Sequence, residues 1–356
     1  MEDYLGKING VSSKAKSLVL RQNKISGRHY ALDKTGLETH TNSELTALAV
    51  RKLVSPDELA GVELLCSGTS TPDFLLPSHA VMVHGHLNEM KAVEVVSNSG
   101  VCCAGMHSLK YAFNAIRSGD KNVAIVTGSE RISGGLRNWQ YESEIAGLNG
   151  SSRDHKLAFD KDFLRWMLSD GAGAFLLDSQ PAKTGISLRI DWVEGVSYAN
   201  SEEVCMYMGG NKSTNGNLKS HFDLRPQEII SESAMSVKQD MRLLGEKIIE
   251  LGVHQLKRSL VKWKQDIDSI TYFLPHISSY YFWNKLADEL AAVKVDIPLN
   301  KWFTNLDRVG NVGSASIFLM MDELFQSGKL KKGDQIIICV PESSRFSYVT
   351  GKFTVC

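Results

Sequence analysis

The chain has 356 residues, 43% of them hydrophobic, which is enough to bury a large core. Its 40 basic and 40 acidic residues leave no formal net charge, so no global attraction favours nucleic acid or an anionic membrane surface. No stretch approaches the roughly 18 uncharged residues of a membrane span, and residues 1–10 lack the apolar centre of a signal peptide. We therefore expect a compact cytoplasmic protein without nucleic-acid or membrane partners.

The cysteines show neither a CxxC pair nor a regular spacing that would indicate a disulfide framework or a zinc site. They are Cys66, Cys102, Cys103, Cys205, Cys339 and Cys356. Reduced thiols are expected, and the sequence predicts no metal and no other cofactor.

Apolar runs of strand length alternate with helical periods, which is typical of βαβ units in a layered α/β fold. The elements expected in the first half are a helix at 41–53, a strand at 62–67, a helix at 78–87 that begins at a capping serine, a strand at 92–96, a helix that extends to about residue 117 and a buried strand at 123–127.

The second half begins with less regular sequence. Residues 131–165 and 200–226 are polar and irregular, which predicts surface loops. Between and after them the pattern predicts a strand at 170–178, a long amphipathic helix at 235–263 and a buried strand at 270–274. No linker separates the halves.

An internal similarity organises the whole chain. VCCAGMHSLKYAFNAIRSGDKNVAIVTG resembles VGNVGSASIFLMMDELFQSGKLKKGDQIIICV near the C-terminus, because each has a glycine-rich turn, a helix, a Ser-Gly stop and an apolar strand. Two similar halves, 1–180 and 181–356, are therefore expected to pack about a pseudo-twofold axis. Cys103 and Asn311 occupy equivalent helix-entry positions, and this axis would bring them face to face.

Cys103 lies in the stretch SNSGVCCAGMHSLKY, where a strand pattern gives way to a helix. Unpaired N–H groups at the first turn of a helix favour thiolate over thiol, which would make a nucleophile near neutral pH. Gly100 and Gly105 would leave room for a substrate carbonyl and a backbone oxyanion donor. The competing interpretation is a small core residue, to which we assign Cys102.

Two further residues complete a candidate site. His276 follows the strand at 270–274, which is a common place for a catalytic side chain in an α/β sheet, although a lone histidine is more often structural. Asn311 opens a helix in GNVGSAS, where an N-cap is a strong competing interpretation. Cysteine, histidine and asparagine at three strand-to-helix junctions together favour a thioester site.

Nearly the whole chain resembles the thiolase-fold condensing enzymes of the β-ketoacyl-ACP synthase III type. SNSGVCCAGMHS looks like their nucleophile motif, LPHISS their histidine motif and RVGNVGSAS their asparagine motif. The resemblance implies a homodimer with a duplicated five-layered αβαβα sandwich. It also implies that Cys103 accepts an acyl group from a CoA or carrier-protein thioester, while His276 and Asn311 stabilise the enolate of a second thioester.

The sequence departs from that family in PESSRFSY, where a run of glycines is usual. The resemblance places the Ser344 amide in the oxyanion hole, with Glu342, Arg345 and Phe346 beside the acyl pocket. LPHISS and PESSRF also look like the ketosynthase-cyclases that build dialkylresorcinol or stilbene-type rings. A neutral β-ketoacyl extender would avoid contact between a malonyl carboxylate and Glu342.

The resemblance also implies a loop at the dimer interface and a surface that binds the acyl carrier protein or CoA. Phe74 and Leu76 would belong to a dimer-interface loop that borders the pocket. Tyr281 stands where the family often has a carrier-binding arginine, so other basic residues are candidates for carrier or CoA binding, with a solvated surface as the competing interpretation. They are Arg28, Lys257, Arg258, Lys262 and Lys264.

These observations predict a ketosynthase that joins an acyl-cysteine to a β-ketoacyl or malonyl thioester by Claisen condensation, in cyclohexanedione or dialkylresorcinol-type biosynthesis. The alternatives are a malonyl-dependent priming synthase and a non-catalytic partner subunit. Presence of all three candidate site residues favours an enzyme.

Overall fold

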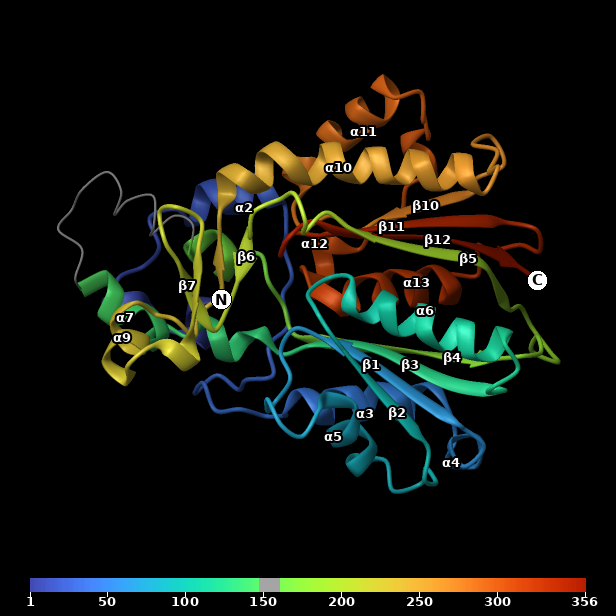
Figure 1. Ribbon diagram of the computed structural model, residues 1–356, viewed down its shortest axis with the longest axis horizontal. Helices are drawn as coiled ribbons and strands as arrows, with labels where there is room; N and C mark the ends of the chain where they lie inside the picture. Colours follow the sequence, from blue (N-terminus) through green and yellow to red (C-terminus); the bar gives the residue numbers. More distant parts are fainter. Residues whose placement is uncertain (147–160) are drawn as a thin grey trace.

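The computed structural model describes residues 1–146 and 161–356 as five layers in the order αβαβα (Figure 1). Two sheets enclose a central helical layer, and further helices cover their outer faces, as the resemblance implies. The central helices are α6 (Ala104–Arg117) and α13 (Ser316–Gln326). The outer helices are α3 (Asn42–Leu53) and α5 (His79–His86) on one side, and α10 (Met241–Lys262) and α11 (Trp283–Ala292) on the other.

The first sheet has the strand order β2-β1-β3-β4. Its first three strands run parallel, and the fourth is antiparallel to its neighbour. They are β1 (Leu64–Thr69), β2 (Glu94–Ser99), β3 (Val123–Glu130) and β4 (Gly171–Asp178). All four were predicted, and their observed bounds differ from the predicted ones by up to three residues because the pairing continues past the apolar runs.

The second sheet has the order β10-β11-β12-β5. Its strands are β10 (Tyr272–Pro275), β11 (Gln335–Glu342), β12 (Ser347–Val355) and β5 (Leu188–Ser197). Phe273 forms one parallel bridge with Trp302, at the place where β1 has a full partner strand in the first sheet. The second sheet is thus less regular at this edge than the first. The strand β5 was missed because its burial pattern does not alternate cleanly.

Some segments predicted as loops contain short elements. Residues 131–146 form η2 (Ile132–Leu136) and α7 (Trp139–Ala146), while residues 147–160 of the same predicted loop lie outside the described residues. The predicted loop at 200–226 contains β6 (Met206–Tyr207), β7 (Gly210–Lys212), β8 (Leu218–Ser220) and η3 (His221–Asp223). It is followed by α9 (Pro226–Ser231), and β9 (Lys238–Gln239) lies where the start of the long helix was predicted. Strands of two or three residues have too little periodic pattern to be predicted.

The remaining short elements join the layers. They are α1 (Glu2–Leu5), η1 (Ile8–Gly10), α2 (Lys16–Asn23), α4 (Pro56–Leu59), η4 (Tyr280–Phe282), η5 (Leu299–Lys301), α12 (Leu306–Val309) and η6 (Gly313–Ala315). Among the described helices, none is both long and apolar enough to cross a membrane.

Capping explains where several helices begin. Thr41 and Glu44 form a capping box at the start of α3, which confirms the predicted helix there. Ser78 has the extended backbone of an N-cap but no capping hydrogen bond from its side chain, unlike the prediction. The α10 helix begins six residues later than predicted because Asp240 accepts from the Leu243 amide at 3.0 Å and ends the preceding extended segment.

The central layer depends on close approach at Gly105 and Gly128. A Cβ atom on Gly105 would lie 2.6 Å from Phe318 Cε2 and 2.8 Å from the Ser314 carbonyl oxygen. Gly128 in β3 faces the same two residues of the α13 segment. Only glycine lets α13 lie this close to α6 and β3, so the packing fixes the position of the loop that carries Asn311.

We expect Gly105→Ala to lower the free energy of unfolding by about 1–3 kcal/mol through overpacking. The matched control is Gly245→Ala in α10, where an added Cβ meets no atom within 4 Å; removing a helical glycine there should raise stability by about 0.5–1 kcal/mol. Urea unfolding monitored by circular dichroism measures both. Equal effects of the two substitutions would contradict the packing argument.

Candidate active site

A cavity of about 250 Å³ opens where the ends of the two sheets meet the 206–208 segment and the first half of α10. Its polar side includes Ser70, Glu130, His276 and Asn311. Its apolar side includes Met206, Met208, Val237, Leu244, Ile248 and Phe282. The cavity therefore joins a cluster of hydrogen-bonding groups to a wall suited to a hydrocarbon chain.

His276 directly follows β10, and its backbone amide donates to the Cys339 carbonyl oxygen at 2.8 Å. This bond extends the β10–β11 pairing and fixes the start of the loop. The residue is 4% exposed, and burial lowers the pKa of its imidazole from 6.5 to about 4. The ring is therefore neutral near pH 7 and can donate one N–H to a ligand in the cavity.

Asn311 lies in the loop before η6. Its backbone pairs with residues 167–169, through Asn311 N to Met167 O at 3.1 Å and Ser169 N to Asn311 O at 2.9 Å. Its side-chain Oδ1 accepts from the Gly313 amide at 3.0 Å. Asn311 is not the N-cap of the competing interpretation, because the N-cap residues of η6 and α13 are Val312 and Ala315. Its bond to Gly313 orients the side chain within the turn and leaves the NH₂ group as the donor for a ligand.

The two adjacent thiols occupy different environments. Cys102 is 7% exposed and packs in a hydrophobic core cluster, as predicted, and it also lines the cavity. Cys103 is the N-cap residue of α6 and is fully buried, with its Sγ directed toward the carbonyl oxygens of Val340 at 3.2 Å and Ser347 at 3.7 Å. The structure therefore brings His276 and Asn311 together with the backbone around Cys103, but not with its sulfur.

The electrostatics of Cys103 also differ from the expectation of a reactive thiolate. Burial raises the pKa of its thiol well above the usual value, and the nearby Glu342 raises it further. The Glu342 carboxylate accepts from the Cys103 amide at 3.1 Å, so this backbone N–H already has a partner. The position at the helix start predicted a lowered thiol pKa. That direction is wrong because burial and the neighbouring Glu342 carboxylate outweigh the effect of the helix start.

The other residues of PESSRF serve the surrounding structure. The Ser344 carbonyl oxygen accepts from the amides of Cys205 at 2.8 Å and Met206 at 3.2 Å. Arg345 is exposed and donates through Nε to the Glu202 carbonyl oxygen at 2.8 Å, so it faces away from the cavity. Phe346 is fully buried among core residues beside Tyr348. None of these three side chains lines the cavity, unlike the expectation.

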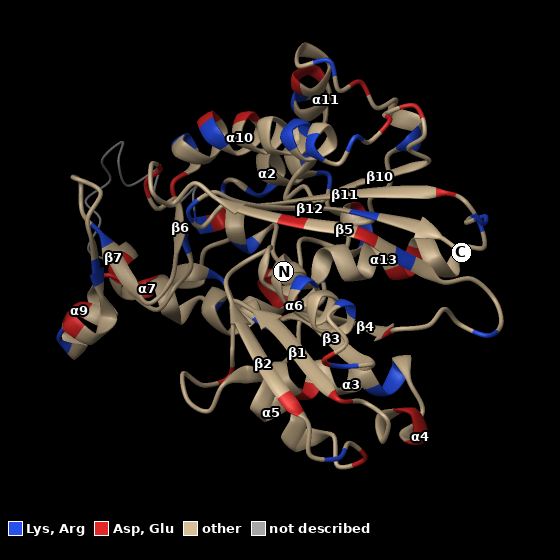
Figure 2. Cartoon of the chain, turned by 45° about the vertical axis from the view of Figure 1, so that its right-hand side comes forward, with Lys and Arg blue, Asp and Glu red and all other residues tan. Residues whose placement is uncertain are grey.

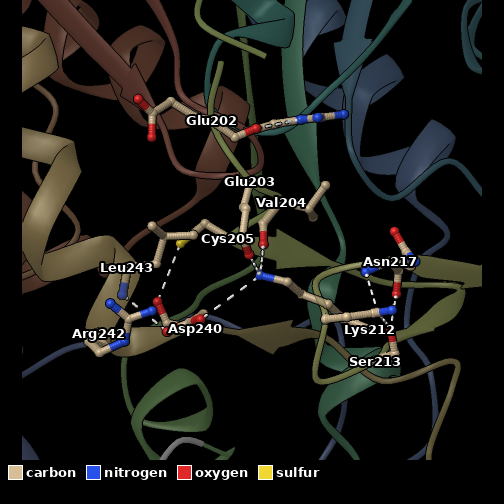
Figure 3. A network of polar contacts seen from close by, with 12 residues as sticks. Glu202, Glu203, Val204, Cys205, Lys212, Ser213, Asn217, Asp240, Arg242 and Leu243 are labelled. Atoms are coloured by element: carbon tan, nitrogen blue, oxygen red, sulfur yellow. Dashed lines mark hydrogen bonds and ion pairs between the residues drawn. The ribbon is translucent and has the colours of Figure 1, made fainter. Parts of the chain in front are cut away.

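A lysine-centred network braces the cavity wall (Figure 3). Lys212 Nζ donates to the Val204 carbonyl oxygen at 2.8 Å and pairs with Glu203 at 2.9 Å and Asp240 at 3.9 Å. The Asp240 amide donates in turn to the Cys205 carbonyl oxygen at 2.7 Å. These contacts hold both ends of the segment that supplies Met206 and Met208 to the wall.

Glu130 was missed by sequence analysis. It is the last residue of β3, it lines the cavity, and its carboxylate accepts from Ser70 Oγ at 2.6 Å, Thr71 Oγ1 at 2.9 Å and the Ser314 amide at 3.2 Å. Burial raises the pKa of this carboxyl from 4.5 to about 7. A carboxylate at the end of the buried strand AIVTGSE was the available signal.

The basic residues suggested for carrier or CoA binding are not gathered at the cavity. Lys257 and Arg258 are exposed in the C-terminal half of α10, whereas the cavity-lining residues of that helix lie in its first half. Lys262 pairs with Glu194 at 3.1 Å, and Lys264 follows the helix end. Figure 2 shows that α10 is an outer helix bearing both basic and acidic residues.

Arg28 is half-buried and donates to the carbonyl oxygens of Trp166 at 2.6 Å and Ile25 at 3.1 Å, which favours a structural role. Tyr281 Oη accepts from Lys285 Nζ at 2.6 Å, next in sequence to the cavity-lining Phe282. Phe74 and Leu76, in the loop after β1, are 52% and 86% exposed.

Two family models match separate parts of the chain. The model of the β-ketoacyl synthase N-terminal domain matches residues 90–182, and that of the 3-oxoacyl-[acyl-carrier-protein (ACP)] synthase III C-terminal region matches residues 260–340. The β-ketoacyl-[acyl-carrier-protein] synthase III of Clostridium beijerinckii is 24% identical over 355 residues, which cover 93% of this chain and 94% of that protein. The chain is a β-ketoacyl-ACP synthase III-like protein. It is accordingly an acyltransferase-type condensing enzyme.

Solved structures agree on the fold of this synthase III-like chain. AbyA1, a tetronic acid condensing enzyme, has a TM-score of 0.73 at 17% identity, with 98% of this chain and 94% of AbyA1 covered. OleA from Xanthomonas campestris, with bound lauric acid and lauroyl-CoA, has a TM-score of 0.72 at 18% identity, with 98% and 90% covered. The expected thiolase fold is thus confirmed.

We expect the unfolding free energy of the synthase III-like protein to depend on pH through the buried Glu130 carboxyl. Because its folded pKa of about 7 is raised from 4.5, its contribution is fully present below pH 4.5 and is lost as the pH rises through 7. Glu130→Gln removes this titration. Between pH 4.5 and pH 8, the unfolding free energy of the wild type should therefore fall by about 3 kcal/mol relative to the variant.

Urea unfolding of both proteins at the two pH values measures the difference. The variant keeps every other titrating group, including the neutral His276, so their contributions cancel. A pH-independent difference would show that burial does not perturb Glu130.

Proposed function

We propose that the chain is a ketosynthase that transfers an acyl group to Cys103 and then condenses it with a β-ketoacyl thioester. The observation that carries the proposal is the pair of uncharged donors, the neutral His276 imidazole and the Asn311 NH₂ group, at one polar end of an apolar cavity. Such donors stabilise the negative charge that develops on a thioester oxygen without giving the enolate a strong acid.

In the first half-reaction, the Cys103 thiolate attacks the carbonyl carbon of an acyl thioester. A new carbon–sulfur bond forms, the original one breaks, and the leaving thiolate takes up the proton that the cysteine loses. In the second, the α-carbon of the extender attacks the acyl-cysteine. A carbon–carbon bond forms, the acyl–sulfur bond breaks, and the proton lost from the α-carbon restores the cysteine thiol.

The charge of the cavity favours a β-ketoacyl extender over malonate. Glu130 is a carboxylic acid among the lining residues, and no Lys or Arg is found among the described residues that line the cavity. A malonyl carboxylate would enter this partly desolvated space without a compensating cation. We assign the condensed product to cyclohexanedione or dialkylresorcinol-type biosynthesis on the resemblance of LPHISS and PESSRF to ring-forming ketosynthases.

The proposal includes a homodimer in the cytoplasm that receives acyl groups from CoA or an acyl carrier protein. The exposed loop with Phe74 and Leu76 supports an interface, because large apolar side chains seldom gather in solvent. A malonyl-dependent priming synthase is the second candidate, favoured by the names of the curated relatives. A non-catalytic partner subunit is the third, and the sealed position of Cys103 is the observation in its favour.

The nucleophile is tested by incubation with lauroyl-CoA, chosen because OleA was solved with that thioester and because the cavity wall is apolar. We expect Cys103→Ala to lose the acyl mass adduct completely and Cys102→Ala to retain it. Intact-protein mass spectrometry with peptide mapping locates the adduct. An adduct on Cys102 in the Cys103→Ala variant would assign the nucleophile to Cys102, and no adduct on any protein would favour the partner subunit.

The extender is tested by supplying the acylated enzyme with β-ketoacyl- or malonyl-carrier protein. We expect the β-ketoacyl thioester to be consumed at least about tenfold faster, since each 1.4 kcal/mol of unfavourable contact is tenfold in rate. Product masses would show condensation without loss of carbon dioxide. Efficient turnover of malonyl-carrier protein with no turnover of β-ketoacyl-carrier protein would reject the β-ketoacyl extender and favour the malonyl-dependent priming synthase.

A further inference from the structure

Glu342 connects the end of β11 to the start of α6. Its Oε2 accepts from the amides of Val101 at 3.0 Å and Cys103 at 3.1 Å, and its Oε1 accepts from Ser344 Oγ at 2.5 Å. The residue is 7% exposed. All three donors are neutral, so the carboxylate is held by hydrogen bonds at the start of a helix rather than by an ion pair.

This position coincides with the place where chemistry at Cys103 requires a free donor. When a cysteine attacks a thioester, negative charge develops on the carbonyl oxygen, and a nearby backbone amide stabilises it. The Cys103 amide is already bonded to Glu342. The thiol of the same residue is directed toward the Val340 carbonyl oxygen at 3.2 Å, which favours the protonated form.

Glu342 is also the carboxylate that acts on the Cys103 sulfur. The other titratable groups that interact with Cys103 are Cys102, Cys339 and Tyr348, and all three are thiols or a phenol with raised pKa values. His107, on the next turn of α6, interacts with Glu342, and burial lowers the pKa of its imidazole. The negative charge near the thiol therefore comes from Glu342.

We propose that Glu342 is a positioning residue that keeps Cys103 in a closed, unreactive state until a thioester enters the cavity. The proposal rests on the assignment of Cys103 as the nucleophile. Its acylation then requires the Glu342 carboxylate to leave the amides of Val101 and Cys103, which frees the oxyanion donor and removes a negative charge from the forming thiolate.

The test measures the rate at which iodoacetamide alkylates Cys103, resolved by peptide mapping, from pH 6 to pH 10. Cys102→Ala serves as the background so that the neighbouring thiol does not compete. Glu342→Gln keeps the shape and an oxygen acceptor but removes the charge. We expect alkylation near pH 7.5 to accelerate about tenfold, with the inflection of the pH profile about one unit lower, because an adjacent charge typically shifts a pKa by that amount or more.

Two further variants make the comparison specific. Glu194→Gln removes a carboxylate from the same sheet, on β5, where it contacts Lys262 at the end of α10 and the C-cap residue Trp263. Its rate and pH profile should match those of the background protein. Ser344→Ala removes one hydrogen bond to Glu342 and leaves its charge, so it should give a smaller acceleration. This variant also tests the proposal if thermal unfolding shows that Glu342→Gln does not fold.

Unchanged or slower alkylation with an unchanged inflection, in whichever of the two variants at Glu342 and Ser344 folds, would overturn the closed state. Acyl transfer is followed separately with lauroyl-CoA in the proteins that retain Cys102. An adduct on Cys102 would refute the nucleophile assignment, whereas the alkylation profile of Cys103 would still decide whether Glu342 suppresses that thiol. The two failures are therefore distinguishable.

Discussion

The close contact of the α13 segment with α6 and β3 is the constraint on which the site depends. Gly105 and Gly128 have no side chain, so the Phe318 ring and the Ser314 carbonyl oxygen pack directly against the backbone of α6 and β3. This contact brings the loop with Asn311 beside the end of the first sheet. Glu130 then bonds both to that loop, at Ser314, and to the loop after β1, at Ser70 and Thr71.

The cavity can stabilise a negative charge with neutral hydrogen-bond donors, because no Lys or Arg is found among the described residues that line it. Burial keeps the His276 imidazole neutral, and the Gly313 amide orients Asn311 so that its NH₂ group remains available. The carboxyl of Glu130 is shifted toward its neutral form by the same burial. A thioester that gains enolate character therefore meets dipoles, and its charge is stabilised by hydrogen bonding instead of by an ion pair.

The sequence predicted the features that depend on local pattern. Buried strands such as β1 and β3, the helix entries at Cys103 and Asn311, and the position of His276 after a strand all follow from apolar periods and small-residue turns. The contacts of Glu342 could not be predicted, because its carboxylate and the Cys103 amide lie 239 positions apart and meet only through the fold. The two-residue strands that support Met206 were also inaccessible, since they depend on tertiary contacts such as those of Lys212.

The turn between β11 and β12 has a double attachment. Through the Ser344 carbonyl oxygen it holds Met206 in the cavity wall and the adjacent Cys205, and through Glu342 it holds the first turn of α6. The cavity wall and the backbone around Cys103 are therefore anchored to two residues of one turn. A substitution that moves this turn is therefore expected to change the cavity wall at Met206 and the contacts of the Cys103 amide together.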